Sequence, residues 1–284
     1  MSATTLAPGA TSPTASRTSP YRLTFGHVLR SEWIKFRSLR STWWTIGTTI
    51  VVMVLFSMSM AASLNFAAET PEMAAEMGNI STVQAIVLGY IFAQLSVAVL
   101  GALVITGEYS TGMIRSTLSA VPTRLPALWA KAGIIGVVTF VVGVVGIALS
   151  YLVTMPMLSG NDLVPDLGDS VVQRVVLACA GYLALVALVA VGVGTIMRHS
   201  AGSIFTLVAF LFVLPLVASF LSQDWVQDIA KFLPMNLATA MMAVTEADAG
   251  GVEVLSPGGA TIAMVVWAVV SLGAAAVVLK RRDA

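Results

Sequence analysis

Six long apolar runs that contain no charged residue dominate the chain. They cover residues 43–63, 83–105, 132–153, 175–197, 204–221 and 261–279. Each run approaches or exceeds the roughly 20 residues that a helix needs to cross about 30 Å of hydrocarbon, although Pro215 interrupts the fifth. The pattern therefore predicts an all-α integral membrane protein, with residues 42–284 forming a domain of six transmembrane helices.

The amino-acid composition supports a membrane protein and argues against several other classes. Hydrophobic residues make up 57% of the 284 residues and charged residues 10%, against roughly 45–50% and about 25% in soluble domains. A net charge of +1 provides no bulk attraction for nucleic acid, so we expect no nucleic-acid partner. The single cysteine, Cys179, lies in an apolar run, where it is expected to act as a small hydrophobic residue.

The basic residues are concentrated in alternate loops. Thirteen of the 15 Lys and Arg residues lie before the first run, between the second and third, between the fourth and fifth, or after the sixth. By the positive-inside rule these segments are cytoplasmic, so we expect a multi-pass protein of the cell membrane with both termini inside. Eleven of the 14 acidic residues lie in the opposite loops, which we interpret as a solvated outer surface rather than a cation-binding vestibule.

Two different segments precede the first run. Residues 1–22 are rich in Ser, Thr, Pro and Ala and lack the apolar core of a secretory signal peptide, so we expect a disordered cytoplasmic tail. Residues 23–41 repeat apolar side chains at three- and four-residue spacing, which predicts an amphipathic helix at the inner membrane interface. This helix is either a simple anchor or a contact for a partner. Its residues of interest are Glu32, Trp33, Lys35 and Arg37.

Glu32 is the discordant residue of this predicted helix. The helical wheel places it within the apolar face, where a carboxylate without a partner would be costly. Lys35, three residues further along, offers a local partner. A basic residue of the next cytoplasmic loop is the alternative, and such a pair would couple the two elements.

The predicted spans contain no Asp, Glu, Lys, Arg or His, which is unusual for secondary transporters and pumps. The chain also has no Gly-Lys pair and therefore no phosphate-binding loop of the GxxxxGK[ST] type. We expect no metal site, no cofactor and no catalytic residue. Gln94, near the middle of the second run, either forms a hydrogen bond between helices or lines a translocation path.

The cytoplasmic loop at residues 106–126 predicts a short amphipathic helix. Ser110 is a plausible N-cap, and Pro122 is expected to end the helix. Ile114, Leu118 and Val121 share one face, while Arg115 and its polar neighbours occupy the other.

At this loop the chain resembles the type-2 ABC-transporter permeases, which commonly carry Glu-Tyr-Ser-Thr-Gly followed by Ile-Arg after the second span. The corresponding residues here are Glu108, Tyr109, Ser110, Thr111, Gly112, Ile114 and Arg115. The resemblance extends to residues 29–39 and to the six-span layout, and covers roughly residues 24–280.

The resemblance implies a permease subunit that pairs with itself or with a related subunit and binds two cytoplasmic ATPase subunits. Residues 108–119 would be the coupling helix that sits in a groove of the ATPase. The roles transferred individually are those of Glu108, Tyr109, Arg115 and Glu32, for which a cytosol-facing charge at Glu108 and a lipid contact at Arg115 are the plainer alternatives. The permease itself would be no enzyme, because the ATPase is a separate subunit.

The outer loop at residues 222–260 holds a further apolar stretch, which Pro234 and Asn236 interrupt. This stretch is too short and broken to span, so we expect a re-entrant or interfacial helical pair. A surface loop that packs its methionines on neighbouring spans is the alternative.

The expected function is therefore ATP-driven transport, most simply export of hydrophobic or amphipathic substrates. The rivals are an ATPase-independent channel or secondary transporter and a membrane-anchored signalling partner. An intramembrane protease built on His199, Ser200 and Ser203 is a remote alternative, because a nucleophile needs a positioned base.

Overall fold

The computed structural model describes residues 24–69, 81–120, 124–161, 163–221, 223–244 and 255–281. Within these ranges, six helical segments are long and apolar enough to cross a membrane, which confirms the predicted number of spans. They are α2 (Arg40–Glu69), α4 (Thr82–Val87) with α5 (Tyr90–Ser110), α7 (Leu125–Leu158), α8 (Ser170–Met197), α9 (Ser200–Val208) continuing into α10 (Leu214–Ser219), and α13 (Pro257–Arg281). The predicted tail at residues 1–22 lies outside the described residues.

A separate helix, α1 (Phe25–Ser38), precedes the first span, as the amphipathic pattern predicts. It ends at Leu39, whose backbone is extended, and α2 begins directly afterwards at Arg40. The first span is therefore longer at its start than the predicted run from residue 43, because the polar residues before Trp43 already belong to α2.

The fifth span remains helical although it contains Pro215. Residues 209–213 form a π-helical segment between α9 and α10, in which the N–H of Leu214 donates to the carbonyl of Ala209. Proline has no N–H to donate, and a widened turn just before it accommodates this loss. The helix ends at Ser219, two residues earlier than the predicted run.

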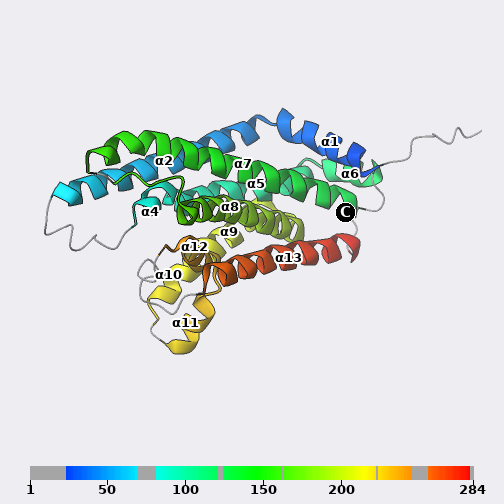
Figure 1. Ribbon diagram of the computed structural model, residues 1–284. Coiled ribbons are helices and arrows are strands. Elements are labelled where there is room, and N and C mark those ends of the chain that lie inside the picture. The colour runs from blue at the N-terminus through cyan, green and yellow to red at the C-terminus, as the bar shows by residue number, and fades with distance from the viewer. Residues whose placement is uncertain are drawn as a thin grey trace, which may run out of the picture.

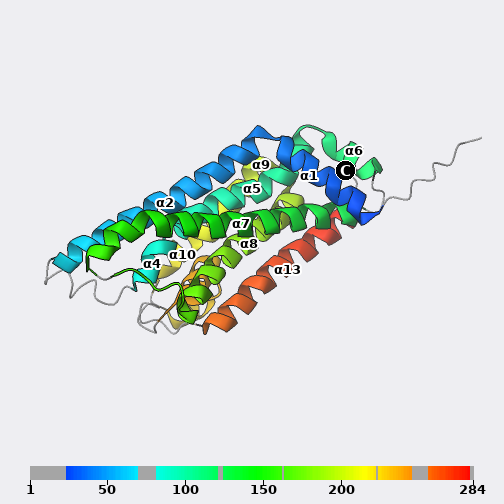
Figure 2. The ribbon, with the colours of Figure 1, turned by 45° about the horizontal axis from the view of Figure 1, so that its top comes forward.

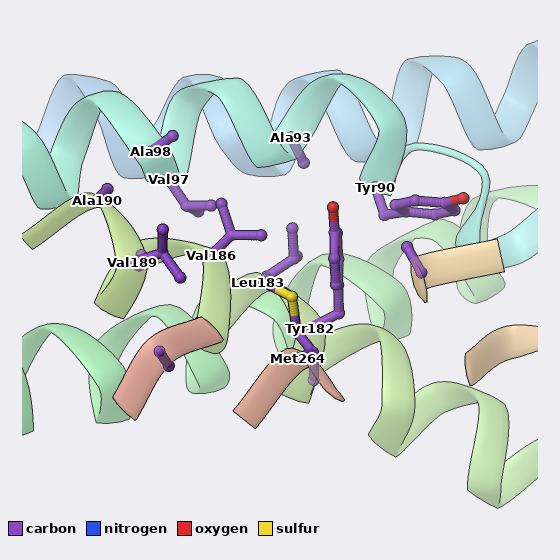
Figure 3. Packing of buried hydrophobic residues seen from close by; sticks show 14 of the residues in the cluster. Tyr90, Ala93, Val97, Ala98, Tyr182, Leu183, Val186, Val189, Ala190 and Met264 are labelled. Atoms are coloured by element: carbon purple, nitrogen blue, oxygen red, sulfur yellow. The ribbon is translucent and has the colours of Figure 1, made fainter. Parts of the chain in front are cut away.

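Helix α8 is the centre of the bundle and packs against α5, α7 and α13 (Figures 1 and 2). Tyr182 of α8 is fully buried and meets Tyr90 of α5 edge to face, with ring centroids 5.7 Å apart (Figure 3). Close approach depends on small residues, because a Cβ added at Gly101 would lie 2.5 Å from the carbonyl oxygen of Ala187. The described core therefore combines aliphatic side chains with small residues at the points where two helices approach most closely.

The small residues of α7 make contacts within this chain. A Cβ at Gly143 would lie 2.9 Å from the Cα of Ala180 in α8, and one at Gly146 would lie 2.5 Å from the Sδ of Met53 in α2. The repeated glycines of the third span thus allow two neighbouring helices of the same subunit to approach closely.

The two ends of the bundle carry different elements. Helix α1, the short helix α6 (Met113–Ala120) and the C-terminal end of α13 lie at one end, whereas α11 (Asp224–Ala230) lies toward the other (Figures 1 and 2). The segments that the distribution of basic residues assigns to the cytoplasm therefore gather at a common end.

The stretch between the fifth and sixth spans contains two helices, α11 and α12 (Pro234–Met242). One hydrogen bond joins the two helices, because Asn236 Nδ2 of α12 donates to the carbonyl of Ala230 in α11 over 2.8 Å. Another joins the pair to α13, because Trp267 Nε1 donates to the carbonyl of Phe232 over 2.9 Å. Met241 and Met242 are buried, and α12 packs against α8 and α13. The described residues thus form two helices, with the methionine packing expected in the alternative. A re-entrant or interfacial position of the pair stays a prediction.

Candidate functional site

The candidate site begins where α5 continues beyond the predicted end of the second span. The helix extends to Ser110, so Glu108 and Tyr109 lie on its last turn. The prediction that Ser110 caps the next helix is wrong, because its hydroxyl donates to the carbonyl of Gly107 within α5 over 3.0 Å. Helix α6 starts only at Met113.

Gly112 makes the turn between these two helices. Its φ of +73° lies in the left-handed region, which glycine adopts without a steric penalty. The turn brings α6 back beside the end of α5, with Ile114 and Thr117 buried and Arg115 exposed. The short amphipathic helix predicted within residues 106–126 is therefore confirmed, although Val121 and Pro122 lie outside the described residues.

Helix α1 approaches the same place from the other side. It packs mainly on α7 and buries Val28, Glu32 and Phe36, which are spaced four residues apart. A carboxylate thus occupies the centre of the buried stripe of α1, as the helical wheel predicts.

Four charged side chains from three helices meet at this point, and we call them the four-charge cluster. Its members are Glu32 and Lys35 of α1, Glu108 of α5 and Lys131 of α7. Lys35 Nζ lies 2.7 Å from Glu32 Oε1 and 3.1 Å from Glu108 Oε1. Lys131 Nζ lies 2.7 Å from Glu108 Oε1 and also contacts Glu32 Oε2. Each lysine therefore bridges both glutamates.

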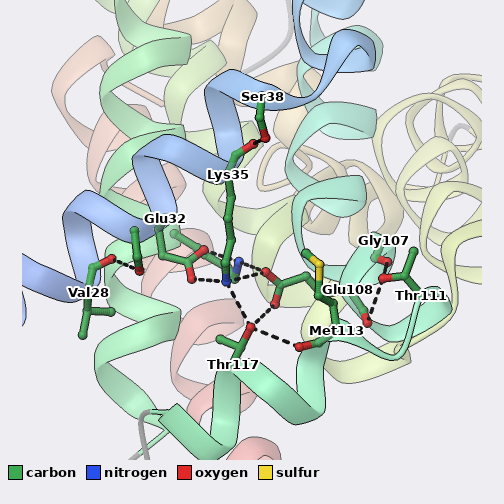
Figure 4. A network of polar contacts seen from close by, with 11 residues as sticks. Val28, Glu32, Lys35, Ser38, Gly107, Glu108, Thr111, Met113 and Thr117 are labelled. Carbon is green, nitrogen blue, oxygen red and sulfur yellow. Dashed lines mark hydrogen bonds and ion pairs between the residues drawn. The ribbon is translucent and has the colours of Figure 1, made fainter.

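Thr117 connects α6 to this cluster. Its hydroxyl oxygen accepts a hydrogen bond from Lys35 Nζ over 3.0 Å and lies 3.4 Å from Glu108 Oε2 (Figure 4). Thr117 is one of the polar neighbours of Arg115 for which the sequence predicts the polar side of α6, but the structure shows that this side chain is turned inward. Four helices, α1, α5, α6 and α7, thus share one polar network.

Burial makes the cluster energetically important. The side chains of Glu32, Glu108 and Lys131 are only 3–6% exposed, whereas Lys35 is 32% exposed. Two carboxylates and two ammonium groups balance, so the cluster as a whole carries no net charge. Buried charges require such pairing, because removing one partner leaves another charge without compensation.

The environment also fixes the charge of Lys35. Burial lowers its pKa, but the hydrogen bond to Glu32 and the charge of Glu108 outweigh burial, so the pKa of Lys35 lies above its ordinary value of 10.5. Lys35 is therefore a cation at neutral pH and holds both carboxylates.

A cavity of about 330 Å³ adjoins the cluster. Its lining includes all four charged residues together with Gly107, Thr111 and Met113 from the α5–α6 turn. The charged groups therefore line a recess beside the turn that connects α5 to α6.

The other predicted site residues divide into an inner and an outer set. Ile114 is buried and Tyr109 is half-buried, with the guanidinium of Arg198 5.3 Å from the centre of its ring. The exposed residues are Trp33, Arg37, Ser110, Thr111, Gly112 and Arg115. Glu108 is 5% exposed, so the alternative in which it is a charge facing the cytosol is wrong.

Gln94 lies apart from this site, in the bundle core. It is fully buried, accepts a hydrogen bond from the hydroxyl of Tyr182 and donates to the carbonyl of Ile91 over 2.9 Å. The hydrogen bond between helices that we expected as one of its two roles is therefore present. Its part in a translocation path stays a prediction.

Lys131 and Thr117 belong to the site but were missing from the predicted set. The sequence contained a signal for Lys131. Lys131 directly precedes the apolar run of the third span, and Glu108 follows the run of the second, so the two charges flank consecutive spans at the same side. The requirement that Glu32 find a basic partner left open Lys35 or a residue of the next loop, and the structure shows both.

The His199, Ser200 and Ser203 group does not form a catalytic pair. His199 Nδ1 accepts a hydrogen bond from the backbone N–H of Gly202 over 3.1 Å and thereby caps α9. Ser203 donates to the carbonyl of His199, and Ser200 donates to Thr106. Neither serine hydroxyl donates to the imidazole, which argues against the protease alternative.

Comparisons with known proteins add no family to this picture. No protein-family model matches the chain, and no curated protein matches it.

Proposed function

We propose that this chain is the transmembrane permease subunit of an ATP-driven ABC transporter. In this proposal two copies, or one copy and a related subunit, associate with two cytoplasmic ATPase subunits. The observation that carries it is the position of the Glu108–Arg115 stretch, which ends a spanning helix, turns at Gly112 and presents a short helix beside α1. The resemblance of this stretch to permease coupling loops supports the same conclusion.

In this proposal two groups of residues take part in coupling: exposed residues that contact the ATPase and buried residues that connect the helices of the permease. Arg115, Thr111 and Ser110 are exposed at the turn and along α6, where a partner protein has access to them. Glu108 and Glu32 are buried and act within the chain, through Lys35 and Lys131. A movement of α6 would be transmitted to α1 and α7, because Thr117 contacts Lys35 and Glu108, and Glu108 contacts Lys131 of α7.

The apolar character of the spans guides the proposal about cargo. Charged residues of the described spans lie near the helix ends and leave the middle of each span uncharged, so we propose export of hydrophobic or amphipathic substrates across the cell membrane, with both termini cytoplasmic. Energy would come from the ATPase subunits, since this chain has no phosphate-binding loop of its own.

The test is purification of the full chain from its own host in a mild detergent, with and without Arg115→Glu. We expect a P-loop ATPase to co-purify at one copy per permease. Because opposed like charges cost several kcal/mol at an interface, Arg115→Glu should lower the recovered ATPase by about tenfold or more.

Arg281→Glu is the matched control, because Arg281 is also exposed and lies at the same end of the bundle but outside α6. Both variants should reach the membrane in the same amount as the unmodified protein. Equal ATPase recovery with the two variants would contradict the role of Arg115. Absence of any ATPase under several mild conditions would favour a channel or a signalling protein instead.

A further inference from the structure

A large apolar groove lies between α1, α2 and α7. Its volume is about 860 Å³, within the range of roughly 300–1,000 Å³ found for small-molecule sites. Leu29 and Trp33 of α1, Trp43 of α2, and Trp129, Val137 and Val141 of α7 are among its lining residues. All six are described as exposed within the chain, so the groove opens outward from the bundle.

Two arginines make this groove different from an ordinary apolar surface. Arg30 and Arg37 line it from α1 and are both exposed. Their spacing of seven residues places them on the same face of α1, two turns apart. Neither guanidinium forms an ion pair with any described residue, and Glu32 and Glu108 are already bound to Lys35 and Lys131.

We propose that this groove holds an anionic glycerophospholipid of the surrounding bilayer. An acyl chain would lie against α7, and the headgroup phosphate would bind Arg30 and Arg37. Guanidinium groups match phosphate oxygens in charge and geometry. A basic pocket beside apolar helix surfaces at the cytoplasmic side is the arrangement that recognises anionic lipids.

The groove has room for an acyl chain beside Gly133 of α7. Gly133 of α7 lines the groove, and a Cβ added there would meet no atom within 4 Å. A larger side chain at this position would fill the groove without displacing the backbone. It would also remove a glycine from a helix interior, which favours the helix.

This inference is independent of the proposed transport function, because it requires only that α2 and α7 lie in a bilayer. The lipid can therefore bind even if no ATPase partner exists. Conversely, a failed lipid test would leave the ATPase experiment unaffected.

The experiment uses the full chain in phosphatidylcholine vesicles and quenching of tryptophan fluorescence by brominated acyl chains. Three of the six tryptophans, Trp33, Trp43 and Trp129, line the groove. Brominated phosphatidylglycerol should reach half of its maximal quenching at a mole fraction roughly tenfold lower than brominated phosphatidylcholine, because two arginines favour the anionic headgroup.

Two variants test the two halves of the site. Arg30→Gln/Arg37→Gln should abolish the preference for phosphatidylglycerol, whereas Lys280→Gln/Arg281→Gln should retain it. This control removes two exposed charges at the same end of the bundle, outside the groove. Gly133→Leu should reduce quenching by phosphatidylglycerol while leaving every charge in place.

Three results would overturn the proposal. Equal quenching by both lipids in the unmodified protein would show that the groove is covered by bulk lipid. Equal loss of preference in both charge variants would indicate general attraction to the membrane surface. Unchanged quenching in Gly133→Leu, together with a changed oligomeric mass, would show that a second copy of the chain occupies the groove.

Discussion

The two ends of the bundle attach their short helices in different ways. At the end with α1 and α6, attachment depends on four charged side chains that contact one another and are almost completely buried, apart from Lys35. At the opposite end, α11 and α12 are attached by side chains of the bundle that donate to backbone carbonyls, such as Trp267 of α13 to Phe232. The first arrangement depends on the identity of each partner, whereas the second has a backbone acceptor that no substitution removes.

Arg174 illustrates the second arrangement most clearly. Its guanidinium donates to the carbonyl oxygens of Met241 over 3.0 Å and Ala243 over 2.7 Å, at the C-terminal end of α12. These carbonyls have no partner within the helix, so a cation is favourable there. Loss of Arg174 would leave dipoles without a partner, whereas loss of a lysine in the four-charge cluster would leave a whole charge.

Lys131→Met should therefore have the largest effect on stability. It leaves Glu32 and Glu108 with only the partly exposed Lys35, and breaking a buried ion pair costs about 3–5 kcal/mol. The free energy of unfolding in detergent measures this loss. Lys131→Met/Glu32→Gln should recover part of it, because the second change removes the uncompensated carboxylate. No recovery in the double variant would mean that the cluster does not act as a balanced unit.

Arg174→Met should have an intermediate effect, because both carbonyl contacts are only part-buried and water can replace some of the lost donors, so the loss should stay near about 1–3 kcal/mol, the cost of one buried acceptor without a donor. The loss should be local, with faster proteolysis within residues 223–244 than in the rest of the chain. Arg281→Met, at the exposed end of α13, is the control and should change neither quantity. A loss as large as that of Lys131→Met would remove the distinction between the two ends.

Asp228→Asn should have the smallest effect and isolates the role of burial. Lys231 Nζ lies 2.8 Å from Asp228 Oδ1, about as close as Lys35 Nζ lies to Glu32 Oε1 at 2.7 Å, but the Asp228 side chain is 67% exposed. Exposed ion pairs contribute about 0–1 kcal/mol. A shift in the free energy of unfolding comparable to that of Lys131→Met would show that distance, rather than burial, sets the strength of these pairs.

The sequence predicted the number of spans well but not where the second ended and the third began. An isolated charge is energetically costly in hydrocarbon. The second predicted run therefore ended before Glu108, and the third began after Lys131. The helices continue through both residues, because the two charges compensate each other. Pairing across 23 positions of sequence is a tertiary property that the local pattern does not contain.

The candidate site was predicted in outline for a similar reason. The apolar wheel of α1 identified Glu32 as a residue that needs a partner, which is a local property. The inward turn of Thr117 depends on the bend at Gly112 and on the positions of Lys35 and Glu108. Thr117 follows Ile114 by three residues, so the helical spacing of α6 already places it at the border of the apolar face, unlike its exposed polar neighbours. The pattern does not contain its partners Lys35 and Glu108, which lie far away in the sequence or on another helix.

The π-helical segment of the fifth span has a consequence for helical phase. Buried residues recur there at Ser203, Leu207, Leu211 and Pro215, always four positions apart. In a regular helix each such step drifts by roughly 40°, so three steps would turn the stripe through roughly 120°. The wider turn at residues 209–213 absorbs part of this drift and keeps Pro215 and Ala218 on the bundle side. The fifth span therefore contains about one residue more than a regular helix would need, and deleting one residue from this segment would rotate α10 out of phase with its neighbours.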